Sequence, residues 1–321
     1  MMRLDDALAL ASAAIAPLAP VNAPHALNLS DPDQESYVFR ADLGDLGSVI
    51  AKVAAPGRLA AQFARLSKTY PKMRSGQFRV PKPLSYDADS GVLLMEDAWG
   101  MAAESVWRNE GKGRARVLAA AGGWLARYHD LTAARAAFNP DPHLNWLGKS
   151  LSAHHDGHRR IPQIRALSDH LPALETLSER ARAAASLRCI THRDFHLRNL
   201  LIRKQDRAYG IDMENAARDE AMRDLLFFLA DTARASLQPP TPETLHETAA
   251  ALCAAYGQSP ADPDARAFFQ HAFALNLWAG LDNAHTQLSA KQQRSLETAQ
   301  ALLACGDLFP DAAQPNQPSG I

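Results

Sequence analysis

The chain has 321 residues, more than one hydrophobic core usually organises, so its length predicts two domains or two lobes. Lysine and arginine number 34 against 35 aspartate and glutamate residues, and the net charge of −1 supplies no positive field for nucleic acid. No stretch reaches the roughly 18 unbroken apolar residues that a membrane-spanning helix needs. The composition indicates a globular protein whose main partner is neither nucleic acid nor a membrane.

The three cysteines, Cys189, Cys253 and Cys305, form no CxxC pair. This pattern argues against a disulfide framework and against a structural zinc site, so we expect a cytoplasmic protein. At the N-terminus, apolar residues recur at helical spacing behind two acids. A signal peptide would begin with positive charge, so we predict an amphipathic first helix instead.

The segment up to residue 97 has the pattern of a small antiparallel sheet with one or two helices. The turn-like sequence DLGDLG lies between two short β-prone runs and predicts a hairpin. We expect Pro71 and Pro81 to bracket an exposed connection. The expected elements are a helix over 7–15, a hairpin over 37–41 and 48–53, a helix over 58–70, and strands over 83–86 and 92–95.

Beyond Gly100 the helical period dominates, so residues 98–321 are expected to form a larger, mostly helical lobe. Three histidines in the polar segment 150–160 are expected to be solvated in a loop. The expected helices cover 114–131, 161–185, 221–237, 242–256, 265–285 and 291–303, with short strands at 200–203 and 208–212.

The densest polar cluster has the pattern H-x-D-x-x-x-x-N, with His192, Asp194 and Asn199, and an apolar strand follows it. On a tight loop, such an aspartate can accept a proton from a hydroxyl group, and the asparagine oxygen can ligate magnesium. A second apolar strand ends at Asp212, and Asp224 follows in a predicted helix. The alternative interpretation is that these side chains only cap loops and turns.

The strings HRDFHLRNLLI and YGIDMENAARDEAMRDL resemble the catalytic loop, metal-binding strand and next helix of the aminoglycoside phosphotransferase and choline kinase family. The resemblance implies an α+β, protein-kinase-like fold, with an N-terminal nucleotide-binding lobe over 1–97 and a C-terminal catalytic and substrate-binding lobe over 98–321. It implies Asp194 as the catalytic base and Asn199 and Asp212 as magnesium ligands. Asp224 would brace the catalytic loop from below, and His192 would be structural.

The resemblance extends to the nucleotide side of the expected site. The strand SVIAKV resembles the one whose lysine contacts the α- and β-phosphates. Strand alternation places Ile50 and Lys52 on the face opposite Val49, Ala51 and Val53. The string GVLLMEDA resembles the strand and hinge that hold adenine, where backbone groups near Glu96 and Ala98 would bind the base. The implied cofactors are ATP and Mg²⁺.

Two features favour a small acceptor over a protein substrate. Two residues after Asp194 the chain has His196, which is common in the small-molecule family, where Ser/Thr protein kinases have a lysine. Only twelve positions separate Asp212 from Asp224, and neither DFG nor APE occurs, so there is no room for a peptide-docking activation segment. A peptide kinase is therefore disfavoured, and the absence of a Walker motif excludes P-loop enzymes.

Two departures from the family pattern leave open a catalytically weak, pseudokinase-like nucleotide-binding module. Most kinases of this fold pair the strand lysine with a helix glutamate, but no acid lies between residues 53 and 73, and Gln62 is the best-placed partner for Lys52. The expected nucleotide-covering loop, 29–37, contains three acids and no glycine. Ser36 in this loop remains a candidate phosphate donor.

The sequence therefore predicts an ATP-dependent kinase that phosphorylates a hydroxyl of a small molecule. Aminoglycosides, amino sugars, sugars and amino alcohols all remain candidate acceptors. From residue 239 onward there are eight acids and three bases, which favours a cationic acceptor, whereas the arginine-rich stretch 159–188 would suit an anionic one. Oligomeric state is not encoded in any of these features.

Overall fold

The computed structural model describes residues 2–27, 36–109, 112–204, 207–282 and 287–309. The chain folds into two compact units. The first contains Met1–Met101 and Asn199–Ala216, and the second contains Ala102–Arg198 and Ala217–Ile321. The short segment that carries Asn199 and Asp212 therefore folds with the N-terminal residues.

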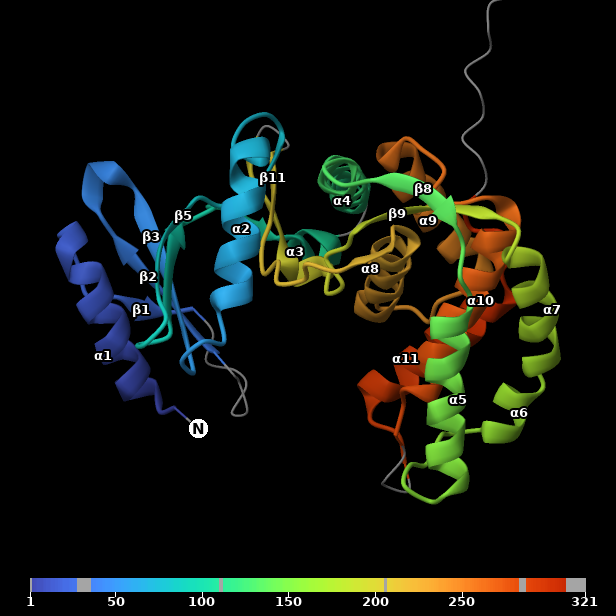
Figure 1. The fold of residues 1–321 in the computed structure, drawn as a ribbon. Coiled ribbons are helices and arrows are strands. Elements are labelled where there is room, and N and C mark those ends of the chain that lie inside the picture. The colour runs from blue at the N-terminus through green and yellow to red at the C-terminus, as the bar shows by residue number, and fades with distance from the viewer. Residues whose placement is uncertain (1, 28–35, 110–111, 205–206, 283–286, 310–321) are drawn as a thin grey trace, which may run out of the picture. The chain divides into compact units, whose positions relative to one another are not determined.

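The first unit is built on a five-stranded antiparallel sheet in the order β1-β2-β3-β6-β5 (Figure 1). The predicted hairpin is confirmed, with Tyr37 opposite Val53 and Ala41 opposite Val49. The strands are β1 (His25–Ala26), β2 (Ser36–Asp42), β3 (Ser48–Ala54), β5 (Pro83–Asp87) and β6 (Val92–Glu96).

Helix α1 (Leu4–Ile15) lies along one face of this sheet, as Figure 1 shows, and packs against β2, β3 and β6. Its buried residues Ala7, Ala11 and Ile15 recur every four positions, which confirms the predicted amphipathic helix. Val49, Ala51 and Val53 of β3 are fully buried in the same cluster. Because side chains alternate along a strand, Lys52 lies on the opposite face.

Helix α2 (Ala60–Met73) packs against β5 and continues through Pro71, so the predicted break at this proline is wrong. Proline lacks the N–H that would bond the carbonyl four residues earlier. The last turn persists because Thr69 and Met73 are buried and anchor it. Pro81 does lie in the connection that leads into β5.

A second sheet in this unit has the order β4-β11-β10-β7. β10 and β11 form an antiparallel hairpin in which Leu200 lies opposite Gly210. These strands are β4 (Phe78–Arg79), β7 (Met101–Ala102), β10 (Leu200–Ile202) and β11 (Ala208–Gly210). Short 3-10 helices are η1 (Ala16–Leu18), η2 (Gly44–Leu46) and η3 (Leu197–Asn199).

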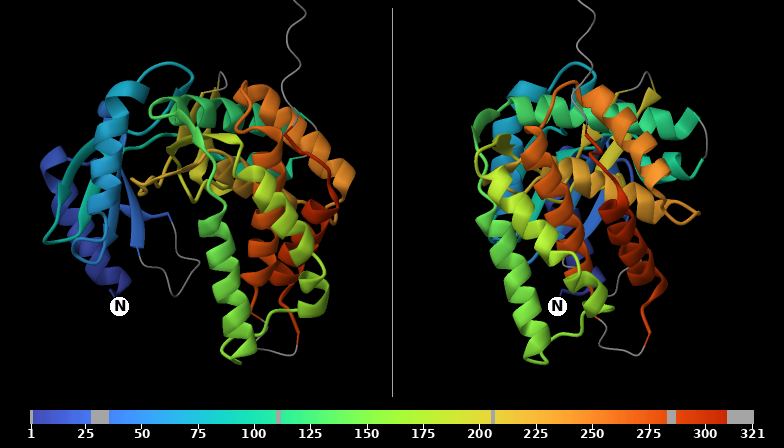
Figure 2. Two further views of the ribbon diagram at one scale, coloured as in Figure 1. Left: turned by 45° about the vertical axis from the view of Figure 1, so that its right-hand side comes forward. Right: turned by 90° about the vertical axis from the view of Figure 1, so that its right-hand side faces the viewer.

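The second unit is mostly helical, and α5, α7 and α10 run side by side in it (Figure 2). The helices predicted near α4, α8, α9 and α11 are confirmed. The helices are α3 (Ala103–Arg108), α4 (Lys112–Asp130), α5 (Asp141–His155), α6 (Ile164–Ser168), α7 (Leu171–Ala181), α8 (Met222–Ala235), α9 (Pro242–Tyr256), α10 (Pro263–Ala279) and α11 (Ala290–Ala304). None of the described helices is both long and apolar enough to cross a membrane.

Three expectations for this unit need correction, and one sheet was not predicted. The helix expected over 161–185 is two helices, because Pro172 occupies the first turn of α7 and favours a new start there. The helix expected over 265–285 ends at Ala279. The expected histidine-rich loop begins inside α5, which includes His154 and His155. A sheet of β8 (Ala134–Ala137), β9 (Ala185–Ile190) and β12 (Arg218–Glu220) was not expected.

Candidate active site

The loop that carries Asp194 is held from below by Asp224 of α8. One carboxylate oxygen of Asp224 accepts the backbone N–H of His192 at 2.6 Å, and the other accepts that of Arg193 at 2.8 Å. Arg193 adopts the left-handed backbone conformation, with φ of +68°. A non-glycine residue in this region is strained, so the two hydrogen bonds fix the turn that presents Asp194.

Asp224 is completely buried, and its charge is supported by a histidine. His129 Nε2 lies 2.9 Å from Asp224 Oδ2, and His129 Nδ1 lies 3.0 Å from the Tyr256 hydroxyl. Burial alone would raise the pKa of Asp224, but the hydrogen bond and charge of His129 together with the backbone donors outweigh it and lower that pKa. Asp224 therefore braces the loop as a carboxylate, as the resemblance implied.

His192 has the structural position that the resemblance implied. Its ring is buried and lies 6.0 Å from the ring of Trp124 and 5.5 Å from that of Phe195. Trp124 and Phe195 stack at 5.0 Å. This aromatic packing supports the loop from α4.

Asp194 itself points outward, with 63% of its side chain exposed. His196 Nε2 lies 3.6 Å from Asp194 Oδ2. The backbone N–H of Arg198 donates to His196 Nδ1 at 3.2 Å, so a neutral His196 carries its proton on Nε2, toward the carboxylate. His196 therefore lies beside the Asp194 carboxylate, at a distance longer than a hydrogen bond.

The first unit brings together three of the residues predicted from the sequence. Lys52 Nζ donates to Asp212 Oδ1 at 2.8 Å and to Gln62 Oε1 at 3.0 Å. Gln62 Nε2 donates to the same Asp212 oxygen at 3.0 Å. Gln62 is therefore the helix partner of Lys52, as expected, and Asp212 supplies the carboxylate that the helix lacks.

Asn199 and Asp212 flank the β10–β11 hairpin. The N–H of Ile211 donates to the Asn199 carbonyl at 3.0 Å, so the two ends of the hairpin lie next to each other. Asp212 then turns in the left-handed conformation, with φ of +61°. A carboxylate and an amide oxygen form an all-oxygen donor pair that suits Mg²⁺, which keeps several of its waters and usually takes one or two protein ligands. The described residues contain no group of three or more His, Cys, Asp or Glu side chains arranged for a metal.

The other predicted nucleotide residues lie in the same unit. Ser36 opens β2, and the register with β3 places it on the same sheet face as Lys52. Most of the expected nucleotide-covering loop, namely residues 29–35 of 29–37, lies outside the described residues. Glu96 ends β6, where its N–H donates to the Lys82 carbonyl at 2.8 Å, and Ala98 follows, largely buried. Asp194 belongs to the second unit.

Sequence reasoning missed the carboxylates that organise these segments. Asp97 accepts from Ser48 Oγ at 2.7 Å and pairs with Arg40 at 2.8 Å, which fixes the segment after β6. Asp231 accepts the Leu197 N–H at 2.9 Å, and Asp219 pairs with Arg193 at 3.3 Å. No short-range pattern identifies these roles, because the partners named here lie 26 to 57 residues away along the chain, although Asp219 and Asp231 also pair with nearby arginines.

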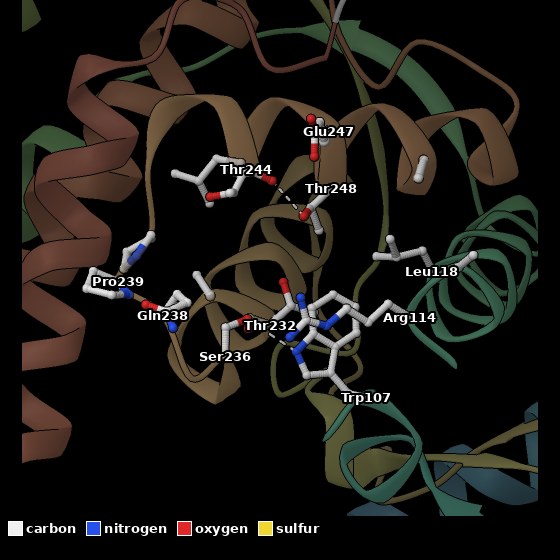
Figure 3. A pocket seen from close by; sticks show the side chains of 15 residues that line it. Trp107, Arg114, Leu118, Thr232, Ser236, Gln238, Pro239, Thr244, Glu247 and Thr248 are labelled. Carbon is white, nitrogen blue, oxygen red and sulfur yellow. Dashed lines mark hydrogen bonds between the residues drawn. The ribbon is translucent and has the colours of Figure 1, made fainter. Parts of the chain in front are cut away.

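One cavity of the second unit, about 320 Å³ in volume, contains none of these residues. Figure 3 shows it between Trp107 of α3, Arg114 and Leu118 of α4, and the polar face of α9. Trp107 Nε1 donates to Ser236 Oγ at 3.4 Å, and the Arg114 guanidinium lies 5.2 Å from the Trp107 ring centre. We assign this cavity no part in the site.

Comparisons with known proteins identify the family and the fold of the chain. Residues 29–269 match the model of the phosphotransferase enzyme family. No curated protein sequence matches the chain at a significant level.

Solved structures share its fold at low identity. A thermostable mutant of aminoglycoside phosphotransferase APH(4)-Ia, in complex with ADP and hygromycin B, is 15% identical, with a TM-score of 0.59 over 92% of this chain and 97% of its own. Macrolide 2'-phosphotransferase MphH from Brachybacterium faecium is 15% identical, with a TM-score of 0.56 over 92% and 98%. Choline kinase LicA from Streptococcus pneumoniae is 15% identical, with a TM-score of 0.53 over 91% and 97%. The chain has the protein-kinase-like fold and belongs to the phosphotransferase enzyme family, the family of aminoglycoside phosphotransferases and choline kinases that its motifs resemble.

Proposed function

We propose that this protein is an ATP-dependent kinase that transfers the γ-phosphoryl group to a hydroxyl of a small molecule. The observation that carries the proposal is the contact of Lys52 with Gln62 and Asp212 beside Asn199. A buried lysine in contact with a carboxylate, with an asparagine at the other end of the same hairpin, supplies the kinds of group that phosphoryl transfer uses to bind phosphates and magnesium. Family membership supports the same reaction class.

Asn199 and Asp212 would hold the magnesium ion, because their oxygens fit its ligand preference. A bound magnesium ion supplies positive charge that neutralises phosphate oxygens and orients them for transfer. Lys52 would contact the phosphates from β3, and Gln62 would keep its ammonium group in place. Ser36, on the same sheet face, would donate its hydroxyl to a phosphate.

Adenine would bind along the segment after β6. The Glu96 N–H is already paired with Lys82, so Ala98 would contribute the backbone donor. The segment is rigid enough for this task because Asp97 binds Ser48 and Arg40.

Asp194 would accept the proton of the acceptor hydroxyl, because its carboxylate is 63% exposed on the loop. The general-base contribution is typically about 10² to 10⁴ in rate, while positioning and charge stabilisation supply most of the rest.

The test is a thermal-shift titration with ATP, with and without Mg²⁺. We expect magnesium to enlarge the ATP-dependent rise in Tm, because a ligand that binds only the native state stabilises it. Asp212→Asn should remove the magnesium-dependent part of the rise. Asp89→Asn, an exposed acid in the same unit, serves as the matched control. Nucleotide binding that does not respond to magnesium, without turnover, would contradict the kinase and support a nucleotide-binding module.

A further inference from the structure

A cavity of about 370 Å³ lies within the second unit, between α5, α8 and α10. Four aromatic side chains line it, namely Trp146, Phe227, Phe269 and Phe273. Trp146 remains 44% exposed. A large aromatic side chain that stays exposed at the edge of an aromatic pocket is typical of a binding site for a ring or another apolar group.

The polar groups of this cavity are positive or neutral. Arg223 and Arg234 project from α8, and His143 and Asn276 come from α5 and α10. Asn276 Oδ1 is buried and has no hydrogen-bond partner among the described residues, so this oxygen can accept a hydrogen bond from a ligand hydroxyl. No aspartate or glutamate is among the described residues that line the cavity.

Two carboxylates connect this cavity to the loop that carries Asp194. Asp219 pairs with Arg193 of the loop and, at 2.6 Å, with Arg223 of the cavity. Because Arg193 directly precedes Asp194, the group that orients a cavity arginine also positions the loop beside Asp194.

The second carboxylate, Asp231, forms a similar pair of contacts with the part of the loop that follows Asp194 in the sequence. Asp231 accepts the Leu197 N–H and pairs with Arg234 at 3.2 Å. The rings of Phe195 and Phe228 lie 5.2 Å apart, next in sequence to Asp194 and to Phe227. The cavity and the catalytic loop are thus parts of one packed assembly within the second unit.

The charges of the cavity discriminate between acceptors. Burial, and then the charge of Arg223, lower the pKa of His143 to about 4, so His143 is neutral at pH 7. Arg193, Arg223 and Arg234 share the two carboxylates of Asp219 and Asp231, and neither carboxylate is among the described residues that line the cavity. An amine placed here would contact guanidinium groups and no lining carboxylate, whereas an anion would be attracted to those guanidinium groups.

We propose that this cavity binds the acceptor, and that the acceptor is an alcohol with an aromatic or apolar ring and an anionic group. The inference rests on the proposed kinase function. It departs from the expectation drawn from the acidic C-terminal segment, because no described acid of that segment lines the cavity. The arginines of 159–188 do not line it either; the discriminating cations are Arg223 and Arg234.

The test compares three probes that share a hydroxymethyl group and a ring: 4-(hydroxymethyl)benzoate, 1,4-benzenedimethanol and 4-(aminomethyl)benzyl alcohol. Binding to the full chain is followed by tryptophan fluorescence and by calorimetry. We expect the carboxylate to bind at least about tenfold more tightly than the amine. Equal affinities, tighter binding of the amine, or no binding of the carboxylate up to roughly 10 mM would overturn the inference.

Two variants test whether the probes bind in this cavity. Arg223→Gln should reduce the preference for the carboxylate severalfold. Because Arg223 also pairs with Asp219, the second variant is Trp146→Ala, which leaves both ion pairs intact and should weaken all three probes alike. An unchanged affinity in both variants would overturn the assignment.

Failure of this inference and failure of the kinase are separate results. Phosphoryl transfer from ATP to an amine-bearing alcohol in preference to the carboxylate would leave the kinase intact and refute the acceptor class. Carboxylate-selective binding in a protein without magnesium-dependent ATP binding would refute the kinase and leave the cavity's selectivity in place.

Discussion

Lys52 is held by one carboxylate and one amide, and the amide comes from α2. Gln62 forms hydrogen bonds with both Lys52 and Asp212, so it fixes the position of the ammonium group relative to the carboxylate. Hydrogen bonds to charged groups are worth about 1.5–3 kcal/mol. The lysine therefore depends on Gln62 for its position, while the charge balance depends on Asp212.

Gln62→Met tests this dependence, because methionine fills a similar volume without either hydrogen bond. We expect the KM for ATP to rise about tenfold, with a smaller change in kcat, since the lost contacts position a phosphate-binding group. Steady-state kinetics at varied ATP provides the measurement. Lys68→Met, on the exposed side of the same helix, is the control. An unchanged KM for ATP would mean that Gln62 does not position Lys52.

Asp224 contributes stability that depends on pH. Its native pKa lies below the ordinary value of 3.8, so its contribution is present above that value and is lost as the pH falls through the native pKa. Asp224→Asn leaves His129 buried without its charged partner and should lower the free energy of unfolding by about 3 kcal/mol at pH 7.

Urea unfolding between pH 3 and pH 7 measures this effect, and the difference between wild type and Asp224→Asn should narrow below about pH 4. Asp130→Asn, an exposed acid on α4, should leave stability nearly unchanged. A difference that stays constant across this range would show that the Asp224 charge is not what stabilises the loop.

At the scale of elements, the packing of α4 on α9 depends on a glycine. A Cβ at Gly122 would lie 2.4 Å from the Leu252 carbonyl oxygen and 2.7 Å from the Ala255 Cβ. These helices carry His129 and Tyr256, which contact each other beneath the catalytic loop. The contact between His129 and Tyr256 therefore requires that the backbones of α4 and α9 approach each other closely.

Gly122→Ala should therefore destabilise the protein by about 2 kcal/mol or more, because a backbone atom must move. The same substitution at Gly148 in α5 meets no atom within 4 Å and should stabilise by up to about 1 kcal/mol through helix propensity. Thermal unfolding of the two variants shows whether each substitution raises or lowers the Tm. Stabilisation by Gly122→Ala would refute the close packing of α4 on α9.

Elements with a clear period and local boundary signals could be predicted from sequence. α9 begins after a Thr241 capping box and ends at Gly257 in the left-handed conformation, and its expected bounds are confirmed. α5 was missed because its glycine and histidines suggested a loop, although Leu144, Leu147 and Leu151 recur at helical spacing. The strand β8, with the helix-prone sequence ARAA, forms only because β9 pairs with it.

For the whole molecule, motif spacing named candidate site residues but not the groups that hold them in place. The pattern around Asp194 and Asn199 could be read locally, and the contact of Lys52 with Gln62 followed from the missing helix acid. The acids Asp219 and Asp231 escaped prediction, because their role depends on loops brought together by folding. Charge counts over long segments do not show which charges face a site, because exposed helix faces are usually charged as well.

The most direct test of the central claim is the rate at which wild type and Asp194→Asn transfer phosphate from Mg–ATP to a panel of ring-bearing alcohols, amino sugars and amino alcohols. The appearance of a phosphate monoester is followed by ³¹P NMR. We predict a monoester with wild type and a rate lower by at least about 100-fold with Asp194→Asn, whose ATP-dependent rise in Tm should be retained. Equal rates for the two proteins would contradict the assignment of Asp194 as the base and, with it, the proposed mechanism.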